Sequence, residues 1–178
     1  PLFRKEFLAR KKITYAQLSI TAAGYYKASL NGVRIGKNTL DPAWTDYSKR
    51  IYYTDYDVTS MVEKGDNCLA VTLGNGFYNP LPLRKWGHRN LRTDTHVGKP
   101  TFLARLFIQY KDGHTEEIVS DTSWKYSYGP ILRNSVYLGV AYDARREIPD
   151  WNRSDFDESG WKPAETGNAP GGKLEKAF

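Results

Sequence analysis

Apolar and polar residues alternate with a period of two along several short stretches of this chain. Residues 17–22 and 26–30 show the alternation, and residues 102–110 carry Phe, Ala, Leu, Ile and Tyr at every second position. This period is typical of β-strands that bury one face. No run of ten or more residues has the spacing of an amphipathic helix. The pattern therefore predicts a protein built almost entirely from strands.

Turn signals between these stretches predict antiparallel connections. Asn31-Gly32 separates Leu30 from Val33, and both central residues of a type I′ turn need the positive φ that Asn and Gly adopt most readily. Asp112-Gly113 ends the long strand, and Ile118-Val119 returns antiparallel to it. Several short strands at this spacing predict an all-β fold, an antiparallel jelly-roll β-sandwich of two sheets.

Length and composition fit one domain with an appended tail. The 178 residues are 40% hydrophobic and include five Trp, thirteen Tyr and seven Phe, enough for a packed core. No apolar run approaches the roughly 20 residues of a membrane span. We expect residues 1–163 to form the sandwich and the Gly/Pro-containing residues 164–178 to be a linker toward a missing downstream domain. Without an initiator Met or an apolar signal segment, the opening sequence is expected to lie within a longer chain.

The formal net charge of +6 attracts acidic partners, but the excess is scattered in small clusters such as Arg4-Lys5. A basic nucleic-acid-binding domain stays an alternative, although no recognised signature accompanies the charge and we expect no nucleic-acid partner. Cys68 stands alone among apolar neighbours, which excludes a disulfide framework and indicates a buried thiol.

The search for catalytic groups finds none to assign. There is no Gly-x-Ser-x-Gly elbow, no His-Glu-x-x-His and no phosphate-binding loop, and the three His lack the spacing of metal ligands. Two acid pairs, Asp55 with Asp57 and Asp155 with Asp157, could serve glycoside hydrolysis in an autonomous hydrolase. Asp57 is better explained as a helix-turn cap, and the second pair as part of a hydrophilic turn.

Two groups of aromatic and polar residues lie outside the regular strands. Aromatic faces cover the apolar side of a sugar ring, and amides, carboxylates or Arg side chains bind its hydroxyls. The alternative is that these aromatic residues close the ends of the sandwich or contact another domain. The long irregular segment 74–100 contributes most of these aromatic and polar residues. Loops of this length are usually functional. The candidates for carbohydrate binding or for an interface are Trp44, Asp46, Asn75, Tyr78, Trp86 and Arg89.

A succession of short motifs resembles the N-terminal β-sandwich module of bacterial α-L-rhamnosidases over residues 3–165. Each motif is weak alone, and their order and spacing carry the resemblance. They are Ala22-Ala23-Gly24-Tyr25-Tyr26, Leu30-Asn31-Gly32, Leu40-Asp41-Pro42-Ala43-Trp44-Thr45-Asp46-Tyr47, Tyr56-Asp57-Val58-Thr59, Gly65-Asp66-Asn67, Leu73-Gly74-Asn75-Gly76-Phe77-Tyr78, Gly129-Pro130-Ile131, Tyr142-Asp143-Ala144-Arg145 and Phe156-Asp157-Glu158-Ser159-Gly160-Trp161-Lys162-Pro163.

The resemblance implies a fold similar to galactose-binding domains, placed ahead of an (α/α)₆ barrel that hydrolyses terminal α-L-rhamnosides with inversion. The catalytic acids would lie in the barrel, so this chain would be a non-catalytic accessory module in polysaccharide degradation. Its partner would be either a rhamnose-containing glycan or the catalytic barrel, and an autonomous lectin-like module is the alternative. A bacterial parent exported to the periplasm, to the cell surface or out of the cell is expected.

Two departures from the family pattern concern ligands. Residues 138–141 read Leu-Gly-Val-Ala where relatives carry an acidic stretch. Some relatives hold a sugar with a bound Ca²⁺, which needs several oxygen ligands, so Ca²⁺ is possible here but lacks that acid. Residues 79–87 form a segment that is long for the family. We expect this segment to shape a different groove or to dock on the catalytic domain.

Overall fold

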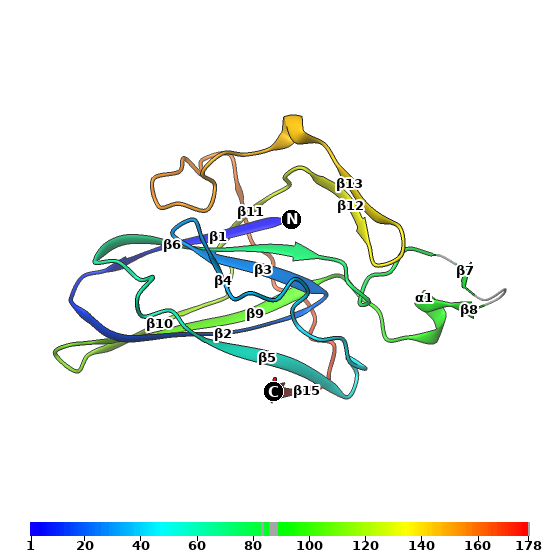
Figure 1. Ribbon diagram of the computed structural model, residues 1–178, viewed down its shortest axis with the longest axis horizontal. Helices are drawn as coiled ribbons and strands as arrows, with labels where there is room; N and C mark the ends of the chain where they lie inside the picture. Colours follow the sequence, from blue (N-terminus) through cyan, green and yellow to red (C-terminus); the bar gives the residue numbers. More distant parts are fainter. Residues whose placement is uncertain (83, 86–88, 178) are drawn as a thin grey trace.

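The computed structural model describes residues 1–82, 84–85 and 89–177, and two sheets face each other across one core (Figure 1). The six-stranded first sheet has the order β14-β11-β1-β6-β3-β4, and the five-stranded second sheet has the order β10-β9-β2-β5-β15. The first contains β1 (Leu2–Ala9), β3 (Tyr25–Leu30), β4 (Val33–Ile35), β6 (Gly65–Gly74), β11 (Lys125–Ser127) and β14 (Lys162–Pro163). The second contains β2 (Ile13–Ala23), β5 (Arg50–Asp57), β9 (Thr101–Tyr110), β10 (Thr115–Val119) and β15 (Lys173–Lys176).

Six short elements of the described residues lie outside the two main sheets. They are the paired strands β7 (Arg84–Lys85) and β8 (Arg89–Asn90), the helical turn α1 (Leu91–Asp94), the hairpin of β12 (Ile131–Ser135) and β13 (Gly139–Tyr142), and the 3₁₀ turn η1 (Ala144–Arg146). The predicted all-β antiparallel sandwich is thus confirmed, with β15 and β5 as its parallel pair. No helix in the described part of the chain is long and apolar enough to span a membrane.

The alternating residues supply the core, as the sequence predicted. Leu18 and Ile20 from β2 and Leu106 and Ile108 from β9 are fully buried and face side chains from β3 and β6. Burying one such side chain stabilises the fold by about 1.5 to 3 kcal/mol. Trp124 is also buried, and its indole N–H donates to the Val119 carbonyl at 2.8 Å.

The turn at Asn31-Gly32 has the predicted geometry, with φ of 52° and 82°. Asn31 does more than form the turn. Its side-chain amide donates to the Oδ1 atom of buried Asn67 at 2.8 Å, and its own Oδ1 accepts from the Cys68 backbone N–H at 2.9 Å. The hairpin is therefore joined to the start of β6 through side chains.

The C-terminal segment, residues 164–178, which the sequence predicts to be a linker, pairs with the second sheet near its end as β15. The Ala164 N–H donates to the Trp124 carbonyl, and the Gly172 N–H donates to the Tyr47 carbonyl. Pairing of this kind uses backbone groups, so it leaves no apolar period in the sequence to predict it. Segment 164–172 is consequently tied to the sandwich at both ends.

Candidate functional site

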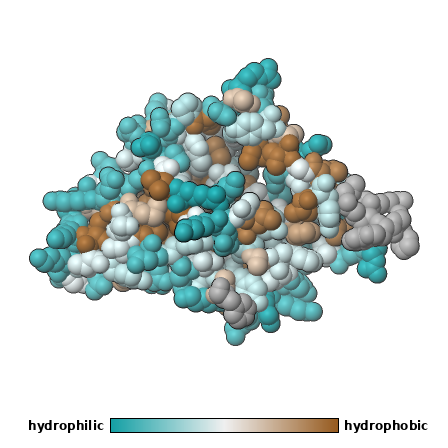
Figure 2. Space-filling view, in the orientation of Figure 1, coloured by the Kyte–Doolittle hydropathy of each residue, from teal (hydrophilic) through white to brown (hydrophobic). Residues whose placement is uncertain are grey.

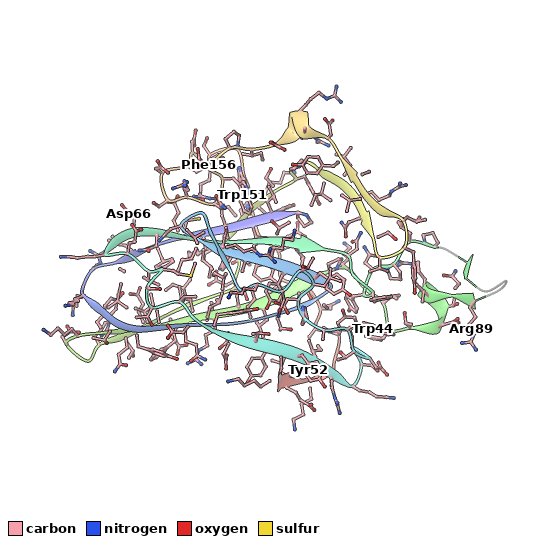
Figure 3. The ribbon with its side chains drawn as sticks, viewed as in Figure 1. Trp44, Tyr52, Asp66, Arg89, Trp151 and Phe156 are labelled. Atoms are coloured by element: carbon pink, nitrogen blue, oxygen red, sulfur yellow. The ribbon has the colours of Figure 1, made fainter. Side chains whose placement is uncertain are left out.

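Trp44 lies on the loop between β4 and β5, at the end of the sandwich that also carries α1 and the β7–β8 pair (Figure 3). Its side chain is 49% exposed, and its ring lies 4.7 Å from the Phe77 ring at 31°. Tyr137, from the turn between β12 and β13, meets Phe77 edge to face at 6.1 Å. We call Trp44, Phe77 and Tyr137 the end cluster. The end cluster brings together Trp44 and segment 74–100, which the sequence predicted as candidates, and the β12–β13 hairpin, which the sequence did not indicate.

Asp46 shapes the loop beside Trp44. Its carboxylate accepts the Ser48 backbone N–H at 3.1 Å and the Ser48 hydroxyl at 2.6 Å, and it pairs with Lys49 at 3.4 Å. The Ser48 hydrogen bonds, with help from Lys49, hold the pKa of Asp46 below its usual value. The side chain thus orders an exposed turn.

Asn75 makes hydrogen bonds through its backbone and its side chain. Its backbone N–H donates to the Asn134 Oδ1 atom at 2.6 Å, and its side-chain amide donates to the Asn134 carbonyl at 2.9 Å. Its Oδ1 atom accepts from the Asn79 amide at 2.9 Å. These bonds fasten the β12 strand to the start of segment 74–100, so Asn75 positions the hairpin.

The other three predicted residues are Tyr78, Arg89 and Trp86. Tyr78 is buried against Tyr47, with ring centroids 5.0 Å apart, and burial raises the pKa of its hydroxyl. Arg89 is exposed on β8, where it pairs with Lys85 of β7 away from the two main sheets (Figure 3). Trp86 lies outside the described residues. The role of the predicted set in binding therefore stays a prediction.

The β12–β13 hairpin is apolar and exposed, and it belongs to neither main sheet. Figure 2 shows hydrophobic surface along it, on the upper right of the view. Its exposed fractions range from 39% for Ile131 to 59% for Val140. The exposed apolar side chains are Ile131, Leu132, Leu138, Val140 and Tyr142, and we call them the hairpin face. A monomer rarely exposes a contiguous set of this kind unless it is functional.

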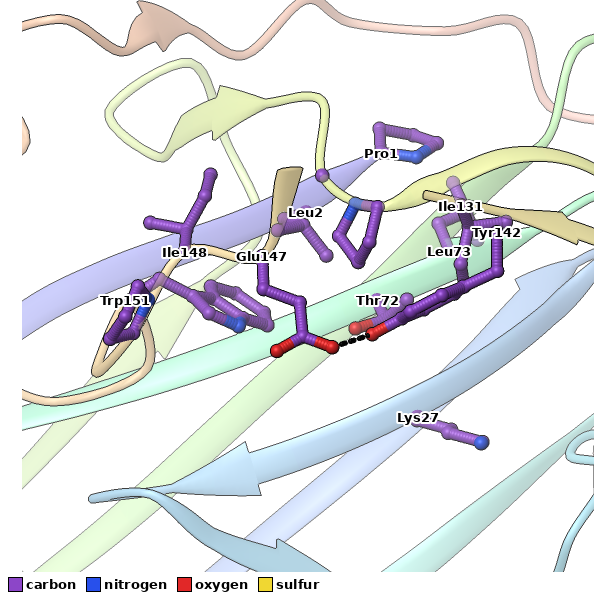
Figure 4. A pocket seen from close by; sticks show the side chains of 13 residues that line it. Pro1, Leu2, Lys27, Thr72, Leu73, Ile131, Tyr142, Glu147, Ile148 and Trp151 are labelled. Carbon is purple, nitrogen blue, oxygen red and sulfur yellow. Dashed lines mark hydrogen bonds between the residues drawn. The ribbon is translucent and has the colours of Figure 1, made fainter. Parts of the chain in front are cut away.

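A second region, which the sequence did not predict as a site, is a pocket of about 460 Å³ at the foot of this hairpin (Figure 4). Leu2, Thr72 and Lys27 form its floor, on neighbouring strands of the first sheet. Its walls come from the covering segment 129–151 and include Tyr142, Glu147 and Trp151. No motif links Lys27 to Glu147, because only the strand register and the path of the covering segment bring them together.

Buried Arg4 anchors the covering segment to the first sheet. Its side chain has no exposed surface, its Nε atom donates to the Trp151 carbonyl at 2.9 Å, and its Nη2 atom donates to the Arg153 carbonyl at 2.7 Å. It also forms ion pairs with Glu6 and Glu158, and it lies 5.2 Å from the centroid of the Phe156 ring. The arginine therefore fixes the backbone from which Trp151 enters the pocket.

The described residues contain no group of three or more His, Cys, Asp or Glu side chains that could hold a metal ion. Where relatives are expected to carry an acid, β13 presents Gly139, Val140 and Ala141. These residues offer no side-chain oxygen to Ca²⁺. The residues present do not fit the calcium site that the resemblance suggested.

Comparison with known proteins agrees with this fold. The family model for the α-L-rhamnosidase N-terminal domain matches residues 11–177, and the chain belongs to that family. An α-L-rhamnosidase from Formosa agariphila is 42% identical over 89% of this chain. The structure of the α-L-rhamnosidase from Dictyoglumus thermophilum matches 99% of the chain with a TM-score of 0.89 and 42% identity. That of the Streptomyces avermitilis α-L-rhamnosidase, solved with L-rhamnose, matches 96% with a TM-score of 0.86 and 37% identity.

The chain spans a small part of these relatives. It covers 17% of the Formosa agariphila protein, 18% of the Dictyoglumus thermophilum chain and 16% of the Streptomyces avermitilis chain. The region shared with them is the β-sandwich described above. The function of the remaining part of a longer parent chain is therefore a proposal.

Proposed function

We propose that this chain is a non-catalytic docking module of an α-L-rhamnosidase, and that the hairpin face and the end cluster pack against the catalytic part of the same enzyme. The observation that carries the proposal is the β12–β13 hairpin, a two-stranded sheet of its own with apolar side chains on its exposed face. A two-stranded hairpin alone is marginally stable in water, and it gains stability when its apolar face is covered.

The partner that would cover the hairpin face is inferred from the relatives. Each is named an α-L-rhamnosidase, and each is more than five times as long as the region it shares with this chain. A parent of that length would contain a large second body of the same polypeptide, for which the family resemblance implies a catalytic barrel. Covalent linkage keeps such a partner at a high effective concentration, so even a modest apolar interface stays closed.

The acid pair Asp55 with Asp57 favours an accessory role over an autonomous hydrolase. Burial opposes ionisation of Asp55, but hydrogen bonds from Lys176 and Ser19 and the charge of Lys176 hold the pKa of this carboxyl below its usual value. Asp57 accepts the Thr59 N–H at 2.9 Å, and this hydrogen bonding also lowers its pKa. Neither group has the raised pKa that suits a general acid in glycoside hydrolysis.

The test is association in trans. The chain is mixed with the remaining part of its parent enzyme, and complex formation is followed by analytical ultracentrifugation. We expect the unmodified chain to form a 1:1 complex. The double variant Leu132→Asp/Val140→Asp should weaken the complex at least tenfold, because two charges would be desolvated in the interface.

The control is Leu103→Asp, which places one new carboxylate on β9, away from the hairpin, where the double variant places two. Leu103 is 52% exposed and Leu132 is 53% exposed, so the two substitutions start from equal solvent access. The control should bind like the unmodified chain. Equal binding by the hairpin variant and the control would show that the hairpin face is not the interface, and the absence of any complex would overturn docking itself.

A further inference from the structure

We propose that the cavity beneath segment 164–172 binds a small organic cation, an amine that carries an aromatic ring. The cavity has a volume of about 400 Å³, which lies within the usual range for small-molecule sites. A cavity of roughly 150 Å³ can hold one benzene ring, so this cavity has room for a body of two fused rings. None of its described lining residues belongs to the hairpin face or to the end cluster, so the site is separate from the docking surface.

Three aromatic side chains line the cavity on the side of the core cluster. The rings of Phe3 on β1 and Phe102 on β9 lie 5.1 Å apart at 63°, and Phe102 meets Trp124 at 5.3 Å and 64°. The Trp124 indole N–H already donates to the Val119 carbonyl, so this wall binds a ligand through ring surface. Aromatic rings attract apolar rings at their edges and faces, and they attract cations at their faces.

Two hydroxyl groups of the lining are already engaged within the protein. The Thr21 hydroxyl donates to the Tyr52 carbonyl, and the Ser120 hydroxyl oxygen accepts the Ala104 backbone N–H at 3.0 Å. The apolar side chains of the lining, besides the aromatic ones, include Ala22, Ala23, Ile51, Leu73, Pro100 and Leu103. A ligand rich in hydroxyl groups finds few partners on such a surface, whereas burial stabilises an apolar ring.

Two carboxylates line the same cavity, and no Lys, Arg or His is among its described lining residues. Asp121 precedes Trp124 by three residues, and Glu165 follows Ala164, whose N–H donates to the Trp124 carbonyl at 2.8 Å. Both acids therefore come from the end of the cavity that contains Trp124. The hydroxyl and the backbone N–H of Ser123 donate to the Asp121 Oδ1 atom and hold the pKa of this carboxyl below its usual value.

The lining thus combines aromatic surface with negative charge, although the formal net charge of the whole chain is +6. Lys5 donates to the Ser123 hydroxyl at 2.7 Å and adds to the lowering of the Asp121 pKa, but it does not line the cavity. The two carboxylates attract an ammonium group, and the aromatic wall covers the ring that carries it. The same charges repel a ligand of equal shape that carries a carboxylate.

Segment 164–172 forms the roof of the cavity as it crosses from the first sheet to β15 on the second (Figure 1). Glycine is needed at two points where the roof touches the sandwich. A Cβ atom on Gly167 would lie 2.4 Å from the Thr101 Cγ2 atom, and one on Gly172 would lie 2.5 Å from the Tyr47 carbonyl oxygen. Hydrogen bonds tie both ends of the segment, and its middle residues are exposed. Such a roof can open for a ligand without loss of either sheet.

The experiment is a calorimetric titration of the chain with three compounds that share the indole ring: tryptamine, indole and indole-3-acetate. Tryptamine carries an ammonium group at neutral pH, indole is uncharged, and indole-3-acetate carries a carboxylate. We expect saturable binding of tryptamine, about fivefold weaker binding of indole, and the weakest binding of indole-3-acetate. The proposal is overturned if tryptamine gives no saturable heat, or if indole-3-acetate binds as tightly as tryptamine.

The double variant Asp121→Asn/Glu165→Gln tests the two carboxylates. It should reduce tryptamine affinity to about that of indole and leave indole affinity unchanged, because both side chains are exposed and keep their shape. The matched control is Glu63→Gln/Asp66→Asn, which removes two exposed carboxylates that do not line the cavity. The control should keep the full preference for tryptamine. An equal preference in both double variants would contradict the assignment.

Hydrogen exchange tests whether the ligand lies beneath the roof. Saturating tryptamine should slow amide exchange in residues 164–172 by a factor of about three or more and leave the β12–β13 hairpin unchanged. Unchanged exchange in the roof at saturation would place the ligand elsewhere and overturn the proposal. The docking variant Leu132→Asp/Val140→Asp should bind tryptamine like the unmodified chain, because neither residue lines the cavity. Failure of docking and failure of this site are therefore distinguishable.

Discussion

Arg4 shows how far the environment of one residue can lie from its appearance in the sequence. In the sequence it belongs to a small basic cluster with Lys5, which is typical of a solvated surface. In the structure its guanidinium is fully buried and donates to two carbonyls that lie 147 and 149 residues further along the chain. Strand alternation places it on the outer face of β1, and the covering segment then closes over it.

Replacing Arg4 with Met should reduce the free energy of unfolding by about 2 to 3 kcal/mol, measured by urea denaturation. The carbonyls of Trp151 and Arg153 would lose their hydrogen-bond donor. Glu6 and Glu158 are partly exposed and would recover some solvation, so the loss of stability stays below that for breaking a fully buried ion pair. Arg105→Met is the control, because Arg105 pairs with Glu117 in solvent. That control should change stability by less than about 1 kcal/mol; equal losses in both variants would contradict an anchoring role.

Among the secondary-structure elements, a strand without an apolar periodic pattern can still join a sheet. β15 is a four-residue strand that pairs parallel to β5, and Leu174 on it is 45% exposed. The chain reaches it through residues 164–172, which close over a cavity of about 400 Å³ beside Trp124 and Phe102. The segment therefore acts as a strap across the second sheet.

A chain that ends at residue 163 should be less stable by about 2 to 4 kcal/mol. It loses the β15–β5 pairing and the two strap hydrogen bonds to Trp124 and Tyr47, and each net hydrogen bond is worth about 1 kcal/mol. The measurement is the urea midpoint at constant slope. An unchanged midpoint would mean that residues 164–178 are the linker that the sequence predicted, and a chain ending at residue 177 serves as the control.

The parts of the fold that the sequence predicted share one property: their signal is local. The alternation in β2 and β9 and the turn at Asn31-Gly32 are written in consecutive residues, and the structure confirms them. The hairpin face and β15 gave no such signal, because their side chains are exposed and their position depends on contacts with distant segments. The pocket depends on the register of Lys27 and Thr72, which periodicity cannot supply.

For the whole molecule, several acidic groups are held in their neutral form by the core. Burial raises the pKa of the Cys68 thiol to about 11 and that of the Tyr47 hydroxyl to about 12. Burial together with the Glu116 carboxylate raises the pKa of Tyr110 to about 12, and burial raises that of Tyr26 as well. Each group keeps its proton in the folded state at a pH where the unfolded chain has lost it. The stability that they contribute is complete at neutral pH and is lost as the pH rises through these values.

We therefore expect the free energy of unfolding to fall as the pH rises from about 9 to 11, with Cys68 accounting for about 2 to 3 kcal/mol of that loss. Urea denaturation at pH 7, 9, 10 and 11 measures the slope. Cys68→Ala lowers stability at every pH through the lost packing, but it should flatten the slope between about pH 9 and 10, before tyrosine titration dominates. An unchanged slope in that variant would show that the thiol is not the group that titrates.

The exposed hairpin has a consequence for the timing of synthesis. If a part of a parent enzyme that follows the sandwich covers it, the hairpin face stays bare from the moment the sandwich folds until that part has been made; the shared region is 18% of the Dictyoglumus thermophilum chain. At translation rates of about 5 to 20 residues per second, this interval lasts from tens of seconds to minutes. During that time the nascent chain exposes an apolar surface that is prone to aggregation. A chaperone that binds this surface would protect the chain until the catalytic part covers it.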